Sequence, residues 1–328
     1  MSPSESNAPV AQRKALLLVN PASRRGGEEN LQEGLDLLAE AGIEVAQHKP
    51  KDTAHMNQLI REHCDQVDFY IIGGGDGTIS AAAPALYDCG KPFAVLPLGT
   101  ANDLARSIGL PEQLTEVFRV IVENRRRRID LGVVNGRYFF NVAHIGLGVR
   151  ITYELTPEIK KRLGVFSYLR AFFRAVSRKK TFHVNLQVDG QSYRQKTIHL
   201  AIGNGRFYGG GNVVDERASI DSGELYLYSL KPQSVLELLT LAPLLRGGKQ
   251  HLVKRTFTAI GRRIEVTTRR PREIHADGEP AGFTPAIFEV LPDALEVFSS
   301  EGEAGELTSK AEQNAGIPDQ HQPETTAA

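Results

Sequence analysis

Residues 69–78 read FYIIGGGDGT. The four apolar and aromatic residues at the start are typical of a strand buried on both faces. A glycine-rich turn follows, Gly73-Gly74-Gly75-Asp76-Gly77-Thr78, which we call the first loop, and then a helix of small residues. Glycines let the backbone approach phosphate oxygens, amides at a helix N-terminus favour an anion, and a carboxylate can hold Mg²⁺. A glycine-rich turn alone is often only a tight turn, and this one matches neither the Rossmann nor the Walker pattern.

Strands and helices alternate on both sides of the first loop. Strands are expected at residues 15–19, 43–46 and 93–96, and helices around residues 31–38, 80–87, from 102 and at 114–124. This alternation predicts an N-terminal α/β nucleotide-binding domain with a parallel sheet, at residues 13–130.

The pattern changes after the four arginines at 125–128. Strands there alternate apolar and polar residues and are separated by turns such as Asn135-Gly136 and Asp189-Gly190, which favour hairpins. We predict a C-terminal antiparallel β-sandwich at residues 131–292, with helical inserts near 157–177 and 232–245. A segment at 293–300 is expected to return to the first domain, and residues 1–12 and 301–328 to be disordered tails.

Composition is that of a globular protein of 328 residues with formal net charge zero. The tail from residue 301 carries six acidic residues and one lysine, so the rest of the chain has a charge of +5. A net positive charge on the rest of the chain suits anionic partners, although charged residues on an ordinary solvated surface explain this charge equally well. Cys64 and Cys89 indicate a reducing compartment more readily than a disulfide. No stretch has the length of a membrane span, and no apolar leader precedes residue 10, so we expect a cytoplasmic protein.

A second loop, Gly99-Thr100-Ala101-Asn102-Asp103-Leu104, follows the next apolar strand. In a parallel sheet it lies beside the first loop, at the edge where ligands bind. Thr100 offers a hydroxyl to a phosphate. Asn102 and Asp103 are equally suited to capping a helix.

A third motif, His275-Ala276-Asp277-Gly278-Glu279-Pro280, places two carboxylates around a glycine. It reads either as a surface hairpin or as the source of a catalytic base, which a kinase needs to accept a proton from the acceptor hydroxyl.

These three motifs, in this order, resemble those of the diacylglycerol kinase catalytic family, which includes bacterial lipid kinases and sphingosine kinases. The resemblance extends from Lys14 to Phe298 and includes Asn20 in the opening loop and Thr53. It implies that ATP binds between the two domains, that Asp76 and Asp103 organise catalytic Mg²⁺, and that Glu279 or Asp277 is the base, with Asp76 a further candidate. The residues that the resemblance places at the nucleotide are Asn20, Thr53, Gly74, Gly75, Asp76, Gly77, Thr78, Ile79, Ser80 and Thr100.

One departure concerns a structural Mg²⁺ site that many bacterial members of the family have in the sandwich. The stretch that matches it has Ser222 where the family has the ligand aspartate, and Asp221 just before it. A hydroxyl binds Mg²⁺ far less well than a carboxylate does. Asp221 is therefore the candidate substitute, unless it only forms a turn.

The resemblance implies a lipid substrate and peripheral contact with a membrane, and an exposed edge strand of the predicted sandwich would suit a homodimer. No aromatic residues interleave the arginines at 125–128, so we expect no nucleic-acid partner. His144, His199 and His275 lie near apolar strands and are expected in the core or cleft rather than as metal ligands. Two alternatives to a lipid kinase are an NAD kinase, which shares the first loop, and a catalytically silent regulator.

Overall fold

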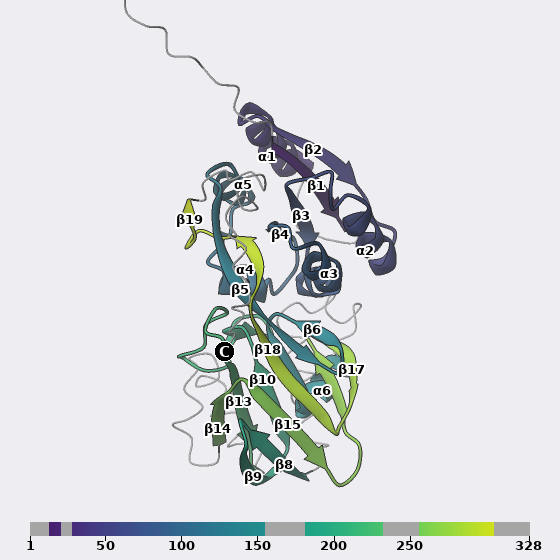
Figure 1. The fold of residues 1–328 in the computed structure, drawn as a ribbon, viewed down its shortest axis with the longest axis vertical. Helices are drawn as coiled ribbons and strands as arrows, with labels where there is room; N and C mark the ends of the chain where they lie inside the picture. Colours follow the sequence, from purple (N-terminus) through teal and green to yellow (C-terminus); the bar gives the residue numbers. More distant parts are fainter. Residues whose placement is uncertain (1–12, 21–27, 155–180, 232–255, 305–328) are drawn as a thin grey trace, which may run out of the picture.

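The computed structural model of the protein describes residues 13–20, 28–154, 181–231 and 256–304 (Figure 1). The inserts predicted near 157–177 and 232–245, and the tails at 1–12 and 305–328, lie outside the described residues. Within the described ranges, no helix has the length and apolar character needed to cross a membrane.

The N-terminal part is built on a parallel sheet in the order β2-β1-β3-β4. Its strands are apolar runs whose two faces enter separate cores: Leu16 and Ile72 pack under α2 and α3, and Leu17 and Ile71 pack under α1 and α5. The elements are β1 (Arg13–Val19), α1 (Glu28–Glu40), β2 (Ile43–His48), α2 (Thr53–Glu62), β3 (Phe69–Gly74), α3 (Asp76–Cys89), β4 (Phe93–Pro97), α4 (Asp103–Ser107) and α5 (Leu114–Val122).

The strand order changes direction between β1 and β3. From β1 the chain passes to β2 on one side and then returns to β3 on the other, with Val19 opposite Gly73. In doubly wound sheets the strand ends at such a switch point leave a crevice for ligands. The first loop therefore begins at the position where this topology favours binding.

The C-terminal part is a β-sandwich, as predicted. One layer is a six-stranded sheet in the order β14-β13-β10-β7-β16-β17, and the other contains β18, β15, β8 and β9. Alternating apolar residues of both layers form the core between them. The elements are β5 (Arg125–Val134), β6 (Arg137–Phe139), β7 (Val142–Gly146), α6 (Leu147–Glu154), β8 (Phe182–Val188), β9 (Gln191–Thr197), β10 (His199–Gly203), β11 (Phe207–Tyr208), β12 (Asn212–Val213), β13 (Leu225–Leu230), β14 (Thr256–Gly261), β15 (Arg263–Thr268), β16 (Glu273–Ala276), β17 (Glu279–Phe283), β18 (Ala286–Phe298) and β19 (Glu303–Ala304).

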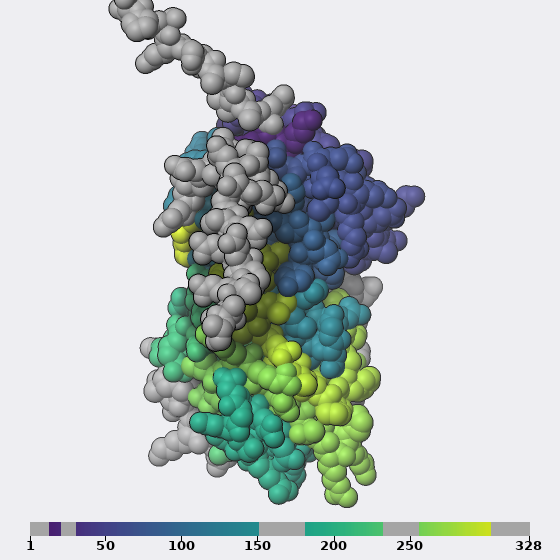
Figure 2. Space-filling view, viewed as in Figure 1, coloured from purple at the N-terminus to yellow at the C-terminus, as the bar shows by residue number. Residues whose placement is uncertain are grey.

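Two long strands join the parts. β5 and β18 pair antiparallel over most of their length, and β18 also pairs with β15 of the sandwich and, through Val297, with Phe93 of β4. The parallel sheet thus continues into one layer of the sandwich as a single eleven-stranded sheet. In Figure 2, the N-terminal part, purple to blue, lies above the sandwich, which is mainly green and yellow.

Several sequence expectations differ from the fold. Residues 192–202 have the sequence pattern of one continuous strand, but they form two strands in different sheets, because the chain changes layer at Ile198. The arginines at 125–128 belong to β5, where neighbouring acids such as Glu296 pair with them. Residues 303–304, assigned to the acidic tail, instead pair with β5 as β19. Helix α6 was not foreseen.

Candidate active site

The first loop connects β3 to α3 at the carboxyl edge of the sheet. Gly75 is the N-cap of α3, and Asp76 is its first residue. Asn20, at the end of β1, donates its backbone N–H to the Gly73 carbonyl at 3.0 Å and its side-chain amide to the Thr78 hydroxyl, also at 3.0 Å. The loop therefore presents the N-terminus of a 14-residue helix to the switch-point crevice, a geometry that favours an anion.

The first and second loops pack backbone against backbone. A Cβ added to Gly99 would lie 2.4 Å from the Gly75 Cα, and one added to Gly75 would lie 3.1 Å from the Gly99 Cα. No side chain can yield to relieve this contact, since the atoms are main-chain atoms. Glycine is required at Gly99 for the two loops to lie this close.

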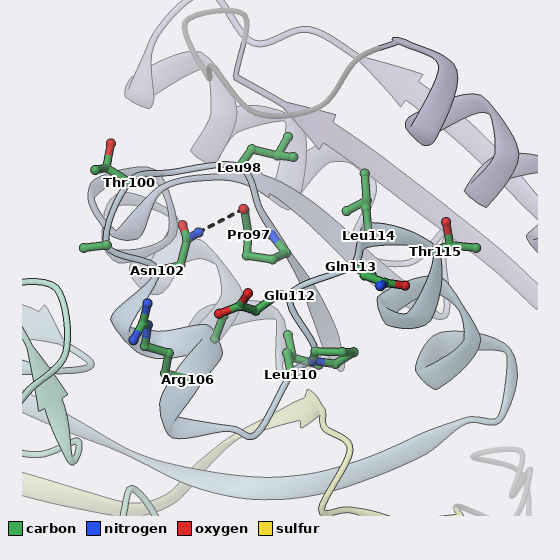
Figure 3. Close-up of a pocket in the computed structure, with 13 residues that line it drawn as sticks. Pro97, Leu98, Thr100, Asn102, Arg106, Leu110, Glu112, Gln113, Leu114 and Thr115 are labelled. Carbon is green, nitrogen blue, oxygen red and sulfur yellow. Dashed lines mark hydrogen bonds between the residues drawn. The ribbon is translucent and has the colours of Figure 1, made fainter. Parts of the chain in front are cut away.

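The second loop is fixed by Asn102, which lies in the left-handed region at φ 51°. Its side-chain carbonyl accepts from the Gly99 N–H at 2.9 Å, and its amide donates to the Pro97 carbonyl at 3.0 Å (Figure 3). Its side chain makes no capping hydrogen bond to α4. Asn102 therefore holds the loop in shape instead of capping the helix with its side chain.

Asp103 is the first residue of α4 and is only 4% exposed. Its carboxylate accepts the N–H groups of Gly210 and Gly211, at 2.9–3.2 Å, from the turn between β11 and β12. A glycine-rich turn of the sandwich thus reaches the second loop of the α/β part.

Asp76 and Asp103 lie together where the two loops meet. The Asp76 carboxylate accepts the N–H of Leu104, the residue after Asp103, at 3.1 Å. Burial together with the negative charge of Asp76 raises the pKa of Asp103 to about 6, and burial raises the pKa of Asp76 as well. Two buried carboxylates that repel each other are stabilised by a cation.

The pair fits Mg²⁺, which is commonly held by one or two carboxylates with phosphate oxygens and water completing its shell. In the described part of the chain, neither this place nor any other gathers three or more His, Cys, Asp or Glu side chains that could hold a metal, so an ion here would need further ligands from phosphate and water. Asp76 and Asp103 are therefore the described residues best placed to hold the ion.

The third motif reaches this site from the sandwich. Asp277 and Gly278, at φ 47° and 91°, form the two-residue turn between β16 and β17. The Asp277 carboxylate accepts the Ser80 hydroxyl at 2.6 Å and the three successive backbone N–H groups of residues 140–142 at 2.8–3.0 Å. Ser80 belongs to α3, so this bond joins the helix of the first loop to the third motif.

Glu279 differs from Asp277 in its surroundings. It is exposed at the start of β17, and its side chain makes no hydrogen bond or ion pair with a described residue. Burial raises the pKa of Asp277, while its four donors hold the carboxylate in place. The motif therefore combines one fixed carboxylate and one that is open to a ligand.

Not every residue expected at the nucleotide has a side chain available to it. Ile79 is 1% exposed and packs in the core, so only its backbone can face a ligand. Ser80 donates its hydroxyl to Asp277. Thr53, at the start of α2, and Thr100 are exposed at the carboxyl edge of the sheet.

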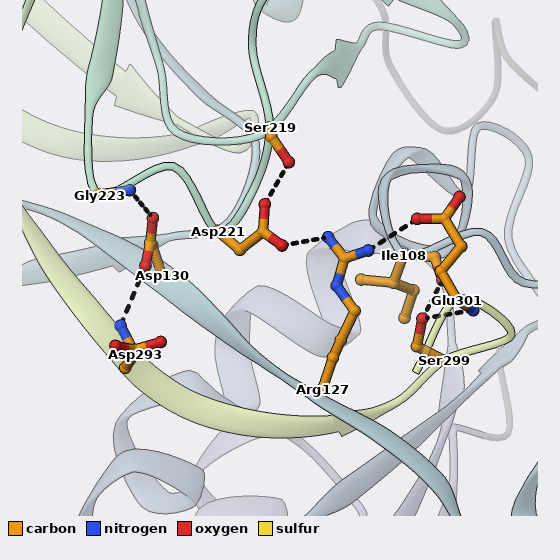
Figure 4. A network of polar contacts seen from close by, with 9 residues as sticks. All are labelled: Ile108, Arg127, Asp130, Ser219, Asp221, Gly223, Asp293, Ser299 and Glu301. Carbon is orange, nitrogen blue, oxygen red and sulfur yellow. Dashed lines mark hydrogen bonds and ion pairs between the residues drawn. The ribbon is translucent and has the colours of Figure 1, made fainter. Parts of the chain in front are cut away.

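Asp221 does not fit a metal ligand. Its carboxylate pairs with the Arg127 guanidinium at 3.3 Å and accepts the Ser219 hydroxyl, and Arg127 also pairs with Glu301 at 2.7 Å (Figure 4). The neighbouring Asp130 carboxylate accepts two backbone N–H groups. Arg127 already supplies the positive charge at this position, so the expectation of Asp221 as a metal ligand is not supported by the contacts around it.

A pocket of about 490 Å³ adjoins the second loop (Figure 3). Thr100 and Asn102 line it on one side, and α5 with the preceding segment closes the other. The pocket lies between residues 97 and 115 and does not include Asp76, so it neighbours the carboxylate pair without containing it.

Sequence reasoning missed the donors that fix the carboxylates. The amides of Gly210, Gly211 and Leu104 are backbone groups, and no side-chain pattern marks them. The glycine run at 209–211, with φ of 60–99° throughout, was the available signal for a specialised turn.

Comparisons with known proteins agree with this geometry. Residues 14–134 match the family model of the diacylglycerol kinase catalytic domain, and residues 142–299 match that of the YegS C-terminal NAD kinase beta sandwich-like domain. A Pseudomonas aeruginosa protein named "Probable lipid kinase YegS-like" is 32% identical over 88% of this chain and 95% of its own. The "Diacylglycerol kinase" of Bacillus subtilis is 27% identical over 90% and 99%.

A solved structure described as "a putative diacylglycerol kinase from Bacillus anthracis str. Sterne" superposes with a TM-score of 0.78 at 26% identity. It covers 91% of this chain and 99% of its own. These matches span both parts of the fold and all three motifs. The chain belongs to the diacylglycerol kinase family of phosphotransferases, which act on an alcohol group.

Proposed function

We propose that this protein is an ATP- and Mg²⁺-dependent lipid kinase that transfers the γ-phosphoryl group to a lipid hydroxyl, with diacylglycerol as the acceptor. The observation that carries the proposal is the convergence of three motifs: Asp76 and Asp103 meet at the loop ends, and Ser80 joins them to the turn at Asp277. Phosphoryl transfer depends on positioning the phosphates, neutralising their charge and orienting the attacking hydroxyl.

Each motif has a role in this reaction. The amides of the first loop and the N-terminus of α3 bind the phosphates. Asp76 and Asp103 hold Mg²⁺, whose charge would offset that of the triphosphate as the phosphoryl group moves. The close packing of Gly75 on Gly99 holds the two loops together and so fixes the Asp76 and Asp103 carboxylates relative to each other.

We assign the base to Glu279. Its carboxylate is exposed and is not engaged by any described residue, so it can reach an acceptor hydroxyl. Asp277 is held by four hydrogen bonds and positions the turn. Although burial raises the pKa of Asp277, both of its carboxylate oxygens are already occupied by those donors, so they are not free to contact an acceptor hydroxyl.

The test compares Glu279→Gln with Asp277→Asn, using radiolabelled ATP and dioleoylglycerol in detergent micelles. Glu279→Gln is expected to lower kcat about 100-fold or more with an unchanged melting temperature, within the range typical of general bases. Asp277→Asn is expected to lower the melting temperature as well. Normal kcat in Glu279→Gln would refute its role. Phosphorylation of NAD in place of the lipid would favour the NAD kinase alternative, and ATP binding without any transfer would favour a silent regulator.

We also propose contact with the bilayer surface, where the acceptor resides. Phe283 and Ile287 are large apolar residues that are 59% and 41% exposed. Exposed apolar side chains of this size favour contact with the bilayer surface. Unchanged flotation of Phe283→Asp with phosphatidylglycerol vesicles would contradict this assignment.

A further inference from the structure

A row of hydrogen bonds crosses the outer face of the six-stranded sheet, on the side away from the core between the layers. Gly148 donates its backbone N–H to His199 Nδ1 at 3.1 Å, and His199 Nε2 lies 3.2 Å from the Tyr228 hydroxyl. The Tyr228 hydroxyl in turn lies 2.6 Å from that of Tyr208. All three side chains are at least 91% buried, and we call them the His199–Tyr208 array.

The direction of hydrogen-bond donation along the array follows from the bond between Gly148 and His199. We assign the hydrogen of the neutral His199 ring to Nε2, because Nδ1 accepts the Gly148 N–H and cannot carry a hydrogen at the same time. Nε2 therefore donates to the Tyr228 oxygen. The Tyr228 hydrogen is then free to be given to Tyr208, its remaining neighbour. His199 thus donates to Tyr228, and Tyr228 donates to Tyr208. The Tyr208 hydroxyl hydrogen is then the one that has no acceptor within the array.

The opposite direction is costlier. If Tyr208 donated to Tyr228, the hydrogen of Tyr228 would have no acceptor among the described residues, at a side chain that is 2% exposed. An unsatisfied buried donor is expensive. At Tyr208, which is 9% exposed, a ligand can accept the hydrogen instead.

The end of the array lies at the candidate active site. Tyr208 closes β11, and the next residues form the glycine turn whose amides bind Asp103. Burial raises the pKa of Tyr208 to about 12, and the negative charge of Asp103 adds to this effect, so the hydroxyl is within electrostatic range of that carboxylate. Its hydrogen bonds nonetheless reach only Tyr228 among the described residues.

A second polar atom beside Tyr208 lacks a partner. The His144 ring lies 5.6 Å from the Tyr208 ring, and its buried Nδ1 has no hydrogen-bond partner within the described ranges. One nitrogen without a partner among the described residues and one hydroxyl whose hydrogen is not used on Tyr228 thus lie together on an otherwise apolar face, which suits a ligand that is apolar with a few polar atoms.

We infer that Tyr208 donates a hydrogen bond to an uncharged oxygen of the lipid acceptor, an ester carbonyl, and that Tyr228 and His199 orient it. The inference rests on the proposed function. An uncharged oxygen is favoured over an anion because the side chains that pack around Tyr208 are mostly apolar, and burying a negative charge among them is costly. Tyr208 thereby becomes a determinant of acceptor specificity, and Tyr228 and His199 are positioning residues.

The experiment compares Tyr208→Phe with the unaltered protein on two acceptors, dioleoylglycerol and the dialkyl ether analogue that lacks both carbonyls. The unaltered protein is expected to have a KM about tenfold lower for the diacyl lipid. Tyr208→Phe is expected to raise the diacyl KM about tenfold while leaving the ether KM and the ATP KM unchanged, since a site built to hydrogen-bond an oxygen discriminates against its absence. Tyr228→Phe, which removes the orienting donor, is expected to raise the diacyl KM less.

Tyr226→Phe is the matched control, because this buried tyrosine is on the same strand as Tyr228 and its hydroxyl donates to the Arg217 carbonyl at 3.2 Å. Its acceptor preference is expected to stay that of the unaltered protein. Equal effects of Tyr208→Phe on both lipids, an altered ATP KM, or no effect would each overturn the inference while leaving the proposed function intact. No transfer to either lipid by the unaltered protein would overturn both.

Discussion

The burial of Asp103, together with its repulsion by Asp76, leads to a quantitative prediction for the variant Asp103→Asn. The pKa of Asp103, about 6, lies about two pH units above its ordinary value of 3.8. Each pH unit corresponds to about 1.4 kcal/mol, so the ionised carboxylate costs the folded state about 3 kcal/mol without a cation. Asparagine removes the charge and keeps a carbonyl that can accept from Gly210 and Gly211.

The sign of the pH dependence follows from linkage. A carboxyl group with a raised folded-state pKa favours folding while it is protonated, and this advantage is lost as pH rises from about 4 to beyond 6. Asp103→Asn does not titrate. It is therefore expected to be up to about 3 kcal/mol more stable than the unaltered protein at pH 8, and to differ little from it at pH 4.

Urea denaturation with EDTA at both pH values measures this difference. Adding Mg²⁺ at pH 8 is expected to stabilise the unaltered protein and not the variant. Asp88→Asn is the control, since Asp88 is an exposed partner of Arg61 at 2.9 Å, and such pairs contribute less than about 1 kcal/mol. An Asp103→Asn difference that is equal at pH 4 and pH 8 would refute the reasoning.

The remaining predictions concern the loops. Gly99→Ala is expected to raise the ATP KM tenfold or more and to lower the melting temperature, because its Cβ would collide with the Gly75 backbone. Gly77→Ala is the companion: its Cβ meets open space, so the melting temperature should stay constant while the ATP KM rises if the phosphates occupy that space. Ser80→Ala is expected to destabilise the fold by about 1–2 kcal/mol by removing a donor from Asp277, and unchanged stability in a thermal melt would show the bond to be dispensable.

The fold was largely predictable because its signals are local. The apolar run at 69–72 followed by glycines identified a buried parallel strand and its loop, and Asp277-Gly278 identified a hairpin turn. The split of residues 191–203 between two sheets was not predictable, because both strands are apolar or alternating and only tertiary pairing separates them. The strand at the four arginines was missed because Glu296 and Asp221, which pair with Arg126 and Arg127, are more than 90 residues away along the chain.

The sequence identified the carboxylates of the candidate site, but it did not show which role each of them has. Asp277 and Glu279 are equivalent in sequence, and only the amides of residues 140–142 and the Ser80 hydroxyl distinguish them. From the sequence, Asp221 was a candidate metal ligand. Arg127, which pairs with its carboxylate in the structure, is distant in sequence, so this ion pair could not be anticipated. The Tyr208 and Tyr228 hydroxyls meet across strands that the sequence does not place together.

Electron paramagnetic resonance of Mn²⁺ bound with a non-hydrolysable ATP analogue tests the central claim most directly. The account predicts tight, nucleotide-dependent Mn²⁺ binding that is lost in Asp76→Asn and in Asp103→Asn alike and is retained in Glu279→Gln. Binding that survives both aspartate substitutions, or that depends on only one of them, would contradict a site built from the two loops together.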